Sequence, residues 1–158
     1  MDIKELKPTS IWHYFDAITG VPRPSKKEER IREFLLNFAK EQNLEVKVDK
    51  TGNVVITKEA TPGCEGAPTV ILQAHMDMVC EKNGDVKHDF ERDPIETYID
   101  GEWVKARGTT LGADNGIGMA AAMAVLADKE LKHGRIQALF TVDEETGLTG
   151  AFGLESGM

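Results

Sequence analysis

A histidine and an aspartate at the end of one apolar run have the types and spacing of a metal site. His75 and Asp77 lie two positions apart in the stretch 69–79, TVILQAHMDMV. Side chains alternate along a strand, so these two project the same way if the extended backbone continues that far. A metal-ligating imidazole is commonly held at its other ring nitrogen by such a carboxylate. On its own, His-x-Asp also fits a loop histidine beside a turn aspartate.

Asp114 is the second candidate, in the glycine-rich segment 111–116, LGADNG, directly ahead of an alanine-rich helix. One interpretation is a helix N-cap, a position that favours aspartate. The other is a carboxylate that bridges two cations and offsets their repulsion by the positive end of the helix dipole. The sequence leaves both interpretations open.

Glu144 and Glu145 follow the apolar run Ile136–Val142. Open α/β sheets place ligands just beyond the carboxyl ends of their strands. Two adjacent acids in an extended segment cannot face the same point, so one would bind a cation while the other handles protons. The alternative is a solvated acidic turn.

Together these residues indicate metal-assisted hydrolysis of an acyl bond. Two divalent ions about 3.5–4 Å apart could share Asp114 and a water, lowering the pKa of that water from about 15.7 towards 7. A nearby glutamate could then take the proton and deliver it to a leaving amine. This hypothesis requires that residues 75–77, 114 and 144–145 meet in one pocket.

The elements that must position these residues alternate between strands and helices, which predicts an α/β layered domain with a mixed, largely parallel sheet flanked by helices. The run Val70–Leu72 is typical of a strand buried on both faces. Ser25 and Glu28 fit a capping box that starts a helix, and Val21–Pro24 precede it as a rigid connector. The other expected elements are helices near 11–18 (N-cap Ser10, stop Gly20), 117–127 and in the last eight residues, strands at 46–48, 54–57 and 136–142, and a hairpin turn at Asp100-Gly101.

Composition narrows the class of protein. The 158 residues, the length of one domain, carry a formal charge of −8, which argues against nucleic-acid binding because no basic patch is present. The two cysteines, Cys64 and Cys80, are too few for a disulfide framework or a cysteine zinc site. The N-terminus lacks the apolar core of a signal peptide, and the longest apolar run, Met119–Ala127, is too short to span a bilayer. We therefore expect a cytoplasmic protein without nucleic-acid or membrane partners.

Four segments carry a resemblance to a known family: IWHYFDAITGVPRPS, LQAHMDMV, DPIETYIDGEWVKARGTTLGADNGIGMA and DEETGLTGAFGL. Over essentially its whole length, the chain resembles the N-terminal part of the cytosolic aminoacyl-histidine dipeptidases (Xaa-His dipeptidase, peptidase D). These belong to the clan of di-zinc exopeptidases. The segment around Asp114 is the most specific, because carboxypeptidase and acylase relatives usually have Lys-Gly-Gly after this aspartate.

The resemblance implies a role for each candidate residue in the hydrolysis of small peptides, Xaa-His dipeptides among them. His75 would ligate one divalent metal ion and Glu145 the other, with Asp114 bridging the two. Asp77 would orient His75, and Glu144 would be the general base. The two ions would be Zn²⁺, with Co²⁺ or Mn²⁺ as alternatives.

The resemblance also implies that residues 1–158 are the N-terminal portion of a zinc exopeptidase-like catalytic domain. The lid domain and the C-terminal part of the catalytic domain, which bring a further aspartate and a distant histidine to the metals, would be absent. Each zinc would then have two protein ligands, fewer than the three of a usual catalytic site. We expect the 158-residue chain alone to be inactive, and the complete protein is compatible with a homodimer.

Three alternatives remain open. Another member of the clan, such as a tripeptidase, carboxypeptidase or acylase, would share the same site. Gly116-x-Gly118-x-x-Ala121 opens a helix and resembles a dinucleotide-binding turn, although the segment before it is polar and Asp114 would repel a pyrophosphate. A non-catalytic interaction domain that kept the fold is the third.

Overall fold

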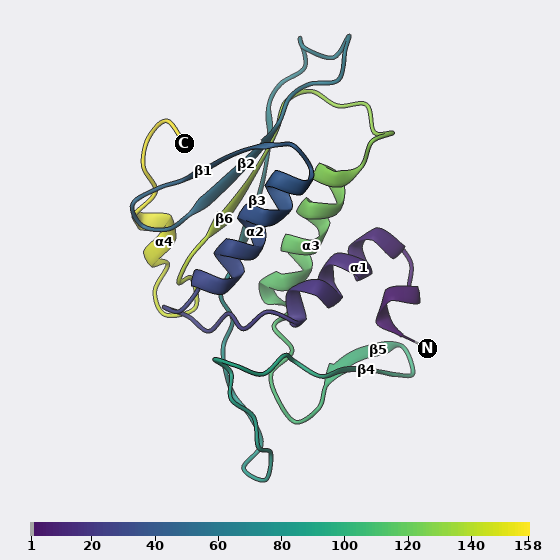
Figure 1. Ribbon diagram of the computed structural model, residues 1–158, viewed down its shortest axis with the longest axis vertical. Coiled ribbons are helices and arrows are strands. Elements are labelled where there is room, and N and C mark those ends of the chain that lie inside the picture. Colours follow the sequence, from purple (N-terminus) through teal and green to yellow (C-terminus); the bar gives the residue numbers. More distant parts are fainter. Residues whose placement is uncertain (1) are drawn as a thin grey trace.

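The structure, a computed structural model, describes residues 2–158 (Figure 1). None of the helices in this part of the chain is long and apolar enough to cross a membrane. The elements in chain order are η1 (Ile3–Glu5), α1 (Thr9–Thr19), α2 (Glu29–Glu41), β1 (Glu45–Val48), β2 (Val54–Lys58), β3 (Val70–His75), β4 (Thr97–Asp100), β5 (Trp103–Ala106), α3 (Ala113–Ala127), β6 (Ile136–Thr141) and α4 (Thr149–Phe152).

A four-stranded sheet in the order β1-β2-β6-β3 forms the centre of the fold (Figure 1). The sheet is mixed, as predicted, but the prediction that it is largely parallel is wrong. Only β3 and β6 run parallel, whereas β2 is antiparallel to both β1 and β6. The tight turn between β1 and β2 forces an antiparallel pair, while the connection from β3 to β6 is long enough to contain the crossover helix α3.

The register of the parallel pair brings two chain segments to one place. Val70 lies opposite Ile136 and His75 lies opposite Thr141, so β3 and β6 end side by side. The segments that follow them, with Asp77 on one and Glu144–Glu145 on the other, therefore leave the sheet at the same edge. This is the arrangement that the hypothesis of one shared pocket requires of the two strand ends.

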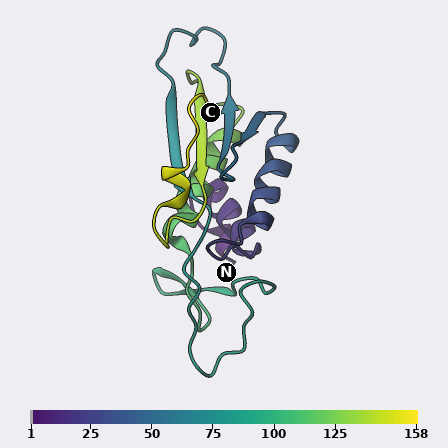
Figure 2. The same cartoon turned by 90° about the vertical axis from the view of Figure 1, so that its left-hand side faces the viewer.

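The three longer helices, α1, α2 and α3, lie on one side of the sheet (Figure 2). α2 packs on β1 and β2, α3 packs on β3 and β6, and α1 packs on α3. On the opposite face the structure places α4 and the residues after it. The prediction that β3 is buried on both faces is wrong: Val70 is 51% exposed and Ile71 62% exposed, although they point to opposite faces. β3 is an edge strand, so no further strand shields its outer side in the described residues. The core between the sheet and the helices includes Phe15, Ile18, Ile31, Leu35, Ile56, Met119, Met123, Leu126, Ala138 and Phe140.

The helix N-termini differ from the expected caps. α1 begins at Thr9 after Pro8, so Ser10 lies in the first turn and is not the cap, whereas Gly20 ends the helix as predicted. α2 begins at Glu29, and the predicted capping box is wrong. The Ser25 and Glu28 side chains do not pair at the helix start; they bond to residues of the two strand ends described below.

The segment ahead of α3 is not a regular helix start. Gly112 has a positive φ of 69°, and Asp114 and Asn115 have non-helical backbone angles inside the span assigned to α3. From Gly116 onward the helix is buried on several sides, as its alanine-rich sequence predicts.

Two smaller predictions are confirmed with shifted bounds. The hairpin loop between β4 and β5 is Gly101-Glu102, one position later than predicted, because Asp100 pairs with Trp103. Gly101 has a φ of 60°, which a glycine adopts without steric cost. α4 starts at Thr149 and ends at Phe152, so the final helix is shorter than expected.

Candidate metal centre

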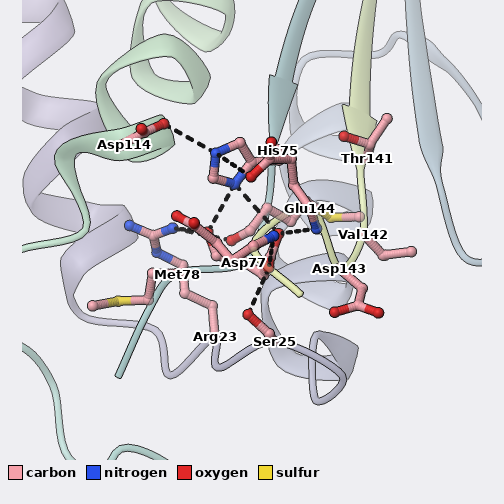
Figure 3. A network of polar contacts seen from close by, with 12 residues as sticks. Arg23, Ser25, His75, Asp77, Met78, Asp114, Thr141, Val142, Asp143 and Glu144 are labelled. Atoms are coloured by element: carbon pink, nitrogen blue, oxygen red, sulfur yellow. Dashed lines mark hydrogen bonds and ion pairs between the residues drawn. The ribbon is translucent and has the colours of Figure 1, made fainter. Parts of the chain in front are cut away.

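His75 is the last residue of β3 and is 5% exposed. Its Nδ1 lies 3.3 Å from Asp77 Oδ1, so the two side chains project to the same side, as predicted (Figure 3). Nδ1 is also 3.1 Å from the Asp77 carbonyl oxygen. A proton held at Nδ1 by these oxygens makes Nε2 the ring nitrogen that would face a cation.

Asp77 is fully buried and accepts three hydrogen bonds besides its contact with His75. The Ser25 hydroxyl donates at 2.6 Å, and the N–H groups of Glu144 and Glu145 donate at 3.0 and 3.2 Å. Burial alone would raise the pKa of Asp77. The contacts with His75, Ser25 and the two N–H groups outweigh burial and hold that pKa far below its usual value, so Asp77 remains a carboxylate.

Asp114 approaches His75 from the N-terminal end of α3. Its Oδ1 lies 3.0 Å from His75 Nε2, although its side chain is 86% exposed. Among the described residues, the Asp114 carboxylate accepts no hydrogen bond from a backbone N–H of α3, whose regular turns begin at Gly116. The N-cap interpretation of Asp114 is therefore wrong, and the carboxylate faces Nε2 of His75 instead.

Both adjacent glutamates lie at the site, because the chain does not stay extended after β6. Asp143 has a φ of 46°, which turns the backbone just before them. Glu144 Oε2 lies 3.7 Å from His75 Nε2. Glu145 offers a carboxylate oxygen within 4.8 Å of ligand atoms of both His75 and Asp114. The reasoning that two neighbouring acids must diverge fails at this turn.

The donor set of His75, Asp114 and Glu145 fits a divalent cation. Their ligand atoms all lie within 4.8 Å of one another. One imidazole nitrogen with carboxylate oxygens is a ligand set that zinc accepts. Burial raises the pKa of Glu145, and the charge of His75 partly opposes this rise. The negative charges of Glu144, Asp114 and Asp77 raise the pKa further. A cation at this point would relieve that repulsion.

Without a cation, His75 takes up the positive charge itself. Burial would lower the pKa of His75, but hydrogen bonds to Asp77 and Asp114, together with the charges of Asp77 and Glu144, raise it to about 9. A metal ion that binds Nε2 must therefore displace a proton at neutral pH.

The site opens into a cleft of about 330 Å³. His75, Asp114 and Glu144 line it together with Gln73 and Thr141 of the neighbouring strands. A cleft of this size accommodates a ligand as small as a dipeptide.

Sequence reasoning missed three residues that contact this site. Arg23, Ser25 and Glu28 belong to the segment between α1 and α2, whose sequence pattern predicts only a rigid connector and a capping box. Each bonds to a residue more than fifty positions away. The one signal in the sequence was that Arg23 and Ser25 lie inside the motif IWHYFDAITGVPRPS.

Comparison with known proteins supports the resemblance. The chain is 53% identical, over 98% of its length, to the cytosol non-specific dipeptidase of Escherichia coli K12. It superimposes with a TM-score of 0.97 and 58% identity, over 99% of its length, on the aminoacylhistidine dipeptidase of Vibrio alginolyticus. A Staphylococcus aureus tripeptidase matches 96% of the chain at 26% identity with a TM-score of 0.78 and is itself covered to 40%.

The chain spans about a third, 32%, of the length of each of the first two relatives. Residues 71–157 match peptidase family M20/M25/M40. This segment is more than half of the chain and contains His75, Asp77, Asp114, Glu144 and Glu145. The chain therefore belongs to peptidase family M20/M25/M40.

Proposed function

We propose that the complete protein is a metal-dependent dipeptidase and that residues 1–158 are the N-terminal portion of its catalytic domain. The observation that carries this proposal is the convergence of His75, Asp114 and Glu145, whose ligand atoms lie within 4.8 Å of one another at the strand ends. In a member of a peptidase family, such a donor set is best explained as part of the catalytic centre.

Two divalent cations, Zn²⁺ first among the candidates, would occupy the centre. His75 would hold one, Glu145 the other, and Asp114 would contact both. When bound, the cations would supply Lewis-acid activation of the substrate carbonyl and of water. The rest of the complete protein would supply the remaining ligands, since three side chains are too few for two catalytic zinc ions.

Glu144 is the proposed general base. Its carboxylate lies at the edge of the cleft, 3.7 Å from His75 Nε2, and is 35% exposed. There it can accept a proton from the attacking water and pass it to the leaving amine as the peptide bond breaks. Asp77 would act through His75, keeping the Nδ1 proton in place so that Nε2 stays available.

The proposed substrates are dipeptides, with Xaa-His dipeptides as the preferred class. The support comes from two similar proteins, one named a cytosol non-specific dipeptidase and the other an aminoacylhistidine dipeptidase. We also propose a cytoplasmic location, by analogy with the first. A homodimer of the complete protein is a further proposal that gel filtration or light scattering can test.

The test is Glu144→Gln in the complete enzyme. The amide cannot accept the proton, so kcat for an Xaa-His dipeptide should fall at least about 100-fold, while the metal content stays that of the wild type. Glu130→Gln, at an exposed position beyond the far end of α3, is the matched control and should change neither quantity. Activity of Glu144→Gln within tenfold of the wild type would contradict the assignment of the base.

A substrate panel separates the remaining alternatives. Hydrolysis of tripeptides in preference to dipeptides would favour a tripeptidase, and release of an acyl group would favour an acylase. The absence of any hydrolysis with full metal content would favour a non-catalytic domain. Membership of a peptidase family removes the reason for the dinucleotide-binding alternative, which retention of NAD by the purified protein would restore.

A further inference from the structure

The connector between α1 and α2, residues 21–28, has three polar side chains that face the metal centre. Arg23 is 2% exposed and Glu28 is 6% exposed. Arg23, Ser25 and Glu28 each bond to a different part of the candidate site (Figure 3 shows the first two). By contrast, Lys27 of the same connector points outward to an ion pair with Glu91.

Arg23 joins two segments that bear proposed ligands. Its Nη1 donates to the carbonyl oxygens of Met76 at 3.0 Å and Asp77 at 3.1 Å, directly after His75. Its Nη2 donates to the carbonyl oxygen of Gly112, two residues before Asp114, at 2.5 Å. One guanidinium group thus spans the gap between the end of β3 and the start of α3.

The chemistry of Arg23 suits this bridging position. Burial lowers the pKa of Arg23 to about 10, so the group is still charged at neutral pH. A planar guanidinium reaches several carbonyl oxygens at once, which the single ammonium of lysine does not. A Cβ added at Gly112 or Gly116 would come within 2.5 or 2.7 Å of Nη2, so these two glycines leave the space that the guanidinium fills.

Glu28 acts on the third segment, the turn after β6. Its Oε1 accepts the Asp143 N–H at 2.9 Å, and Asn53 Oδ1 accepts the preceding N–H, that of Val142, at 3.1 Å. The next two N–H groups donate to Asp77. Four consecutive N–H groups, 142 to 145, therefore donate to side chains from three separate segments, which determines the course of the turn.

Ser25 completes the set from the same connector. Its hydroxyl donates to Asp77 Oδ2 at 2.6 Å, while the other oxygen of the same carboxylate, Oδ1, contacts His75 Nδ1. The Ser25 hydrogen bond therefore fixes the rotation of the Asp77 carboxylate, and through it the orientation of the imidazole.

We propose that Arg23, Ser25 and Glu28 are positioning residues of the metal centre. Arg23 sets the separation of Asp114 from His75, Ser25 orients the Asp77–His75 pair, and Glu28 orients the turn that carries Glu144 and Glu145. This inference rests on the proposed metallopeptidase function. A connector that only stabilises the fold would contribute to melting temperature but not to the metal site.

The experiment uses the complete enzyme, stripped of metal and reconstituted with Co²⁺. Arg23→Lys, Ser25→Ala, Glu28→Met and Glu28→Gln are compared for Co²⁺ affinity, the visible Co²⁺ absorption spectrum, kcat, KM and melting temperature. Lys27→Met, which removes an outward-facing charge from the same connector, is the matched control and should leave all five unchanged.

Loss of an outer partner of a metal site typically costs about 10–100-fold in metal affinity or activity. We expect Arg23→Lys, Ser25→Ala and Glu28→Met to show losses of that size, with altered Co²⁺ spectra and kcat falling more than KM rises. Glu28→Gln keeps an oxygen that can accept the Asp143 N–H, so it should recover most of what Glu28→Met loses. A purely structural role would not produce this recovery in the Co²⁺ spectrum.

Wild-type Co²⁺ spectra and affinities in folded Ser25→Ala and Glu28→Met would overturn the proposal. If Arg23→Lys or Glu28→Met does not fold, Ser25→Ala decides alone, because it removes one hydroxyl from a half-buried residue. Failure of the proposed function is a separate outcome: the wild-type complete enzyme would then neither bind Co²⁺ nor hydrolyse a dipeptide.

Discussion

Two clusters of possible metal ligands lie beside each other in this protein, and each has ligand atoms close enough to hold a cation. The open cluster is His75, Asp114 and Glu145; the buried cluster is Glu28, Asp77 and Asp143. In both clusters the ligand atoms lie within 4.8 Å of one another, so these distances alone do not show which cluster binds a cation. The difference lies in what already satisfies their oxygens.

Each carboxylate of the buried cluster accepts hydrogen bonds from donors of the protein. Asp77 accepts a hydroxyl and two N–H groups in addition to its contact with His75. Asp143 accepts the hydroxyls of Thr146 at 2.6 Å and Thr149 at 2.7 Å, and Glu28 accepts two N–H groups. A buried charge is tolerated when it is hydrogen-bonded in this way.

The carboxylates of the open cluster lack such donors. In the part of the chain that the structure describes, neither Asp114 nor Glu145 accepts a hydrogen bond from a backbone N–H or a hydroxyl group. The comparison teaches that closely spaced acidic side chains do not by themselves indicate a metal site. Carboxylate oxygens that accept no hydrogen bond from a backbone N–H or a hydroxyl group are the better indication. We therefore propose that the open cluster binds the cation and that the buried cluster supports the segments that carry its ligands.

The largest expected effect breaks the open cluster. Asp114→Asn in the complete enzyme removes the proposed bridging carboxylate, so metal content and kcat should both fall by more than the roughly 100-fold that loss of an outer partner costs. Elemental analysis and dipeptide hydrolysis measure the two quantities. Asp85→Asn, on an exposed loop, is the control. A fully metallated Asp114→Asn enzyme would contradict the assignment.

Metal removal tests whether the buried cluster keeps the strand ends together when no cation is bound at the open cluster. A ligand present at a thousand times its Kd stabilises the folded state by about 4 kcal/mol. Chelation of the complete enzyme should therefore lower its melting temperature by several degrees and still leave a cooperative unfolding transition. Calorimetry with and without chelator measures this. Loss of all cooperativity would show that the hydrogen-bonded cluster cannot hold the strand ends together by itself.

A smaller effect is expected in the buried cluster. Thr149→Val removes one hydroxyl donor from the Asp143 carboxylate, which should lower the free energy of unfolding by about 1 kcal/mol. Urea denaturation measures the change. The Co²⁺ spectrum should stay that of the wild type, because Asp143 keeps the hydroxyl of Thr146 and the contacts of Glu28 and Asp77 are unchanged. A shifted spectrum would show that the Thr149 hydroxyl also positions the metal ligands.

The smallest expected effect is the pH dependence of stability that His75 contributes. In the metal-free protein the pKa of His75 is raised from 6.5 to about 9, despite burial, by Asp77 and Asp114. Because the folded value is the higher one, the charge contacts of His75 add stability below about pH 6.5, and this stability is lost as pH rises through about 9. NMR titration of the imidazole measures the midpoint. A midpoint near 6.5 would show that the carboxylates do not hold the proton.

The open cluster was predictable from sequence because its residues lie at the ends of recognisable elements. His75 and the Glu144–Glu145 pair end apolar strands, and Asp114 precedes an apolar helix, so local patterns identify all three places. The resemblance then supplied the roles that spacing could not. In the same way the alternation of strands and helices predicted the layered fold.

The buried cluster and its partners were not predictable, because local patterns there have two solutions. Ser25 and Glu28 fit a capping box, but their partners are Asp77 and Asp143, far along the chain. Only the folded arrangement decides between a local and a distant hydrogen bond. Likewise, an apolar run such as Val70–Leu72 occurs both in central strands and in edge strands, so the sequence does not predict its exposure.

The exposed edge strand has a practical consequence for work with residues 1–158 alone. Among the described residues no strand pairs with the outer side of β3, and Val70 and Ile71 on this strand are exposed, a combination that favours intermolecular strand addition. Purification at low concentration, or a lysine introduced at Ile71 to discourage stacking of chains, would keep preparations of this polypeptide free of aggregates.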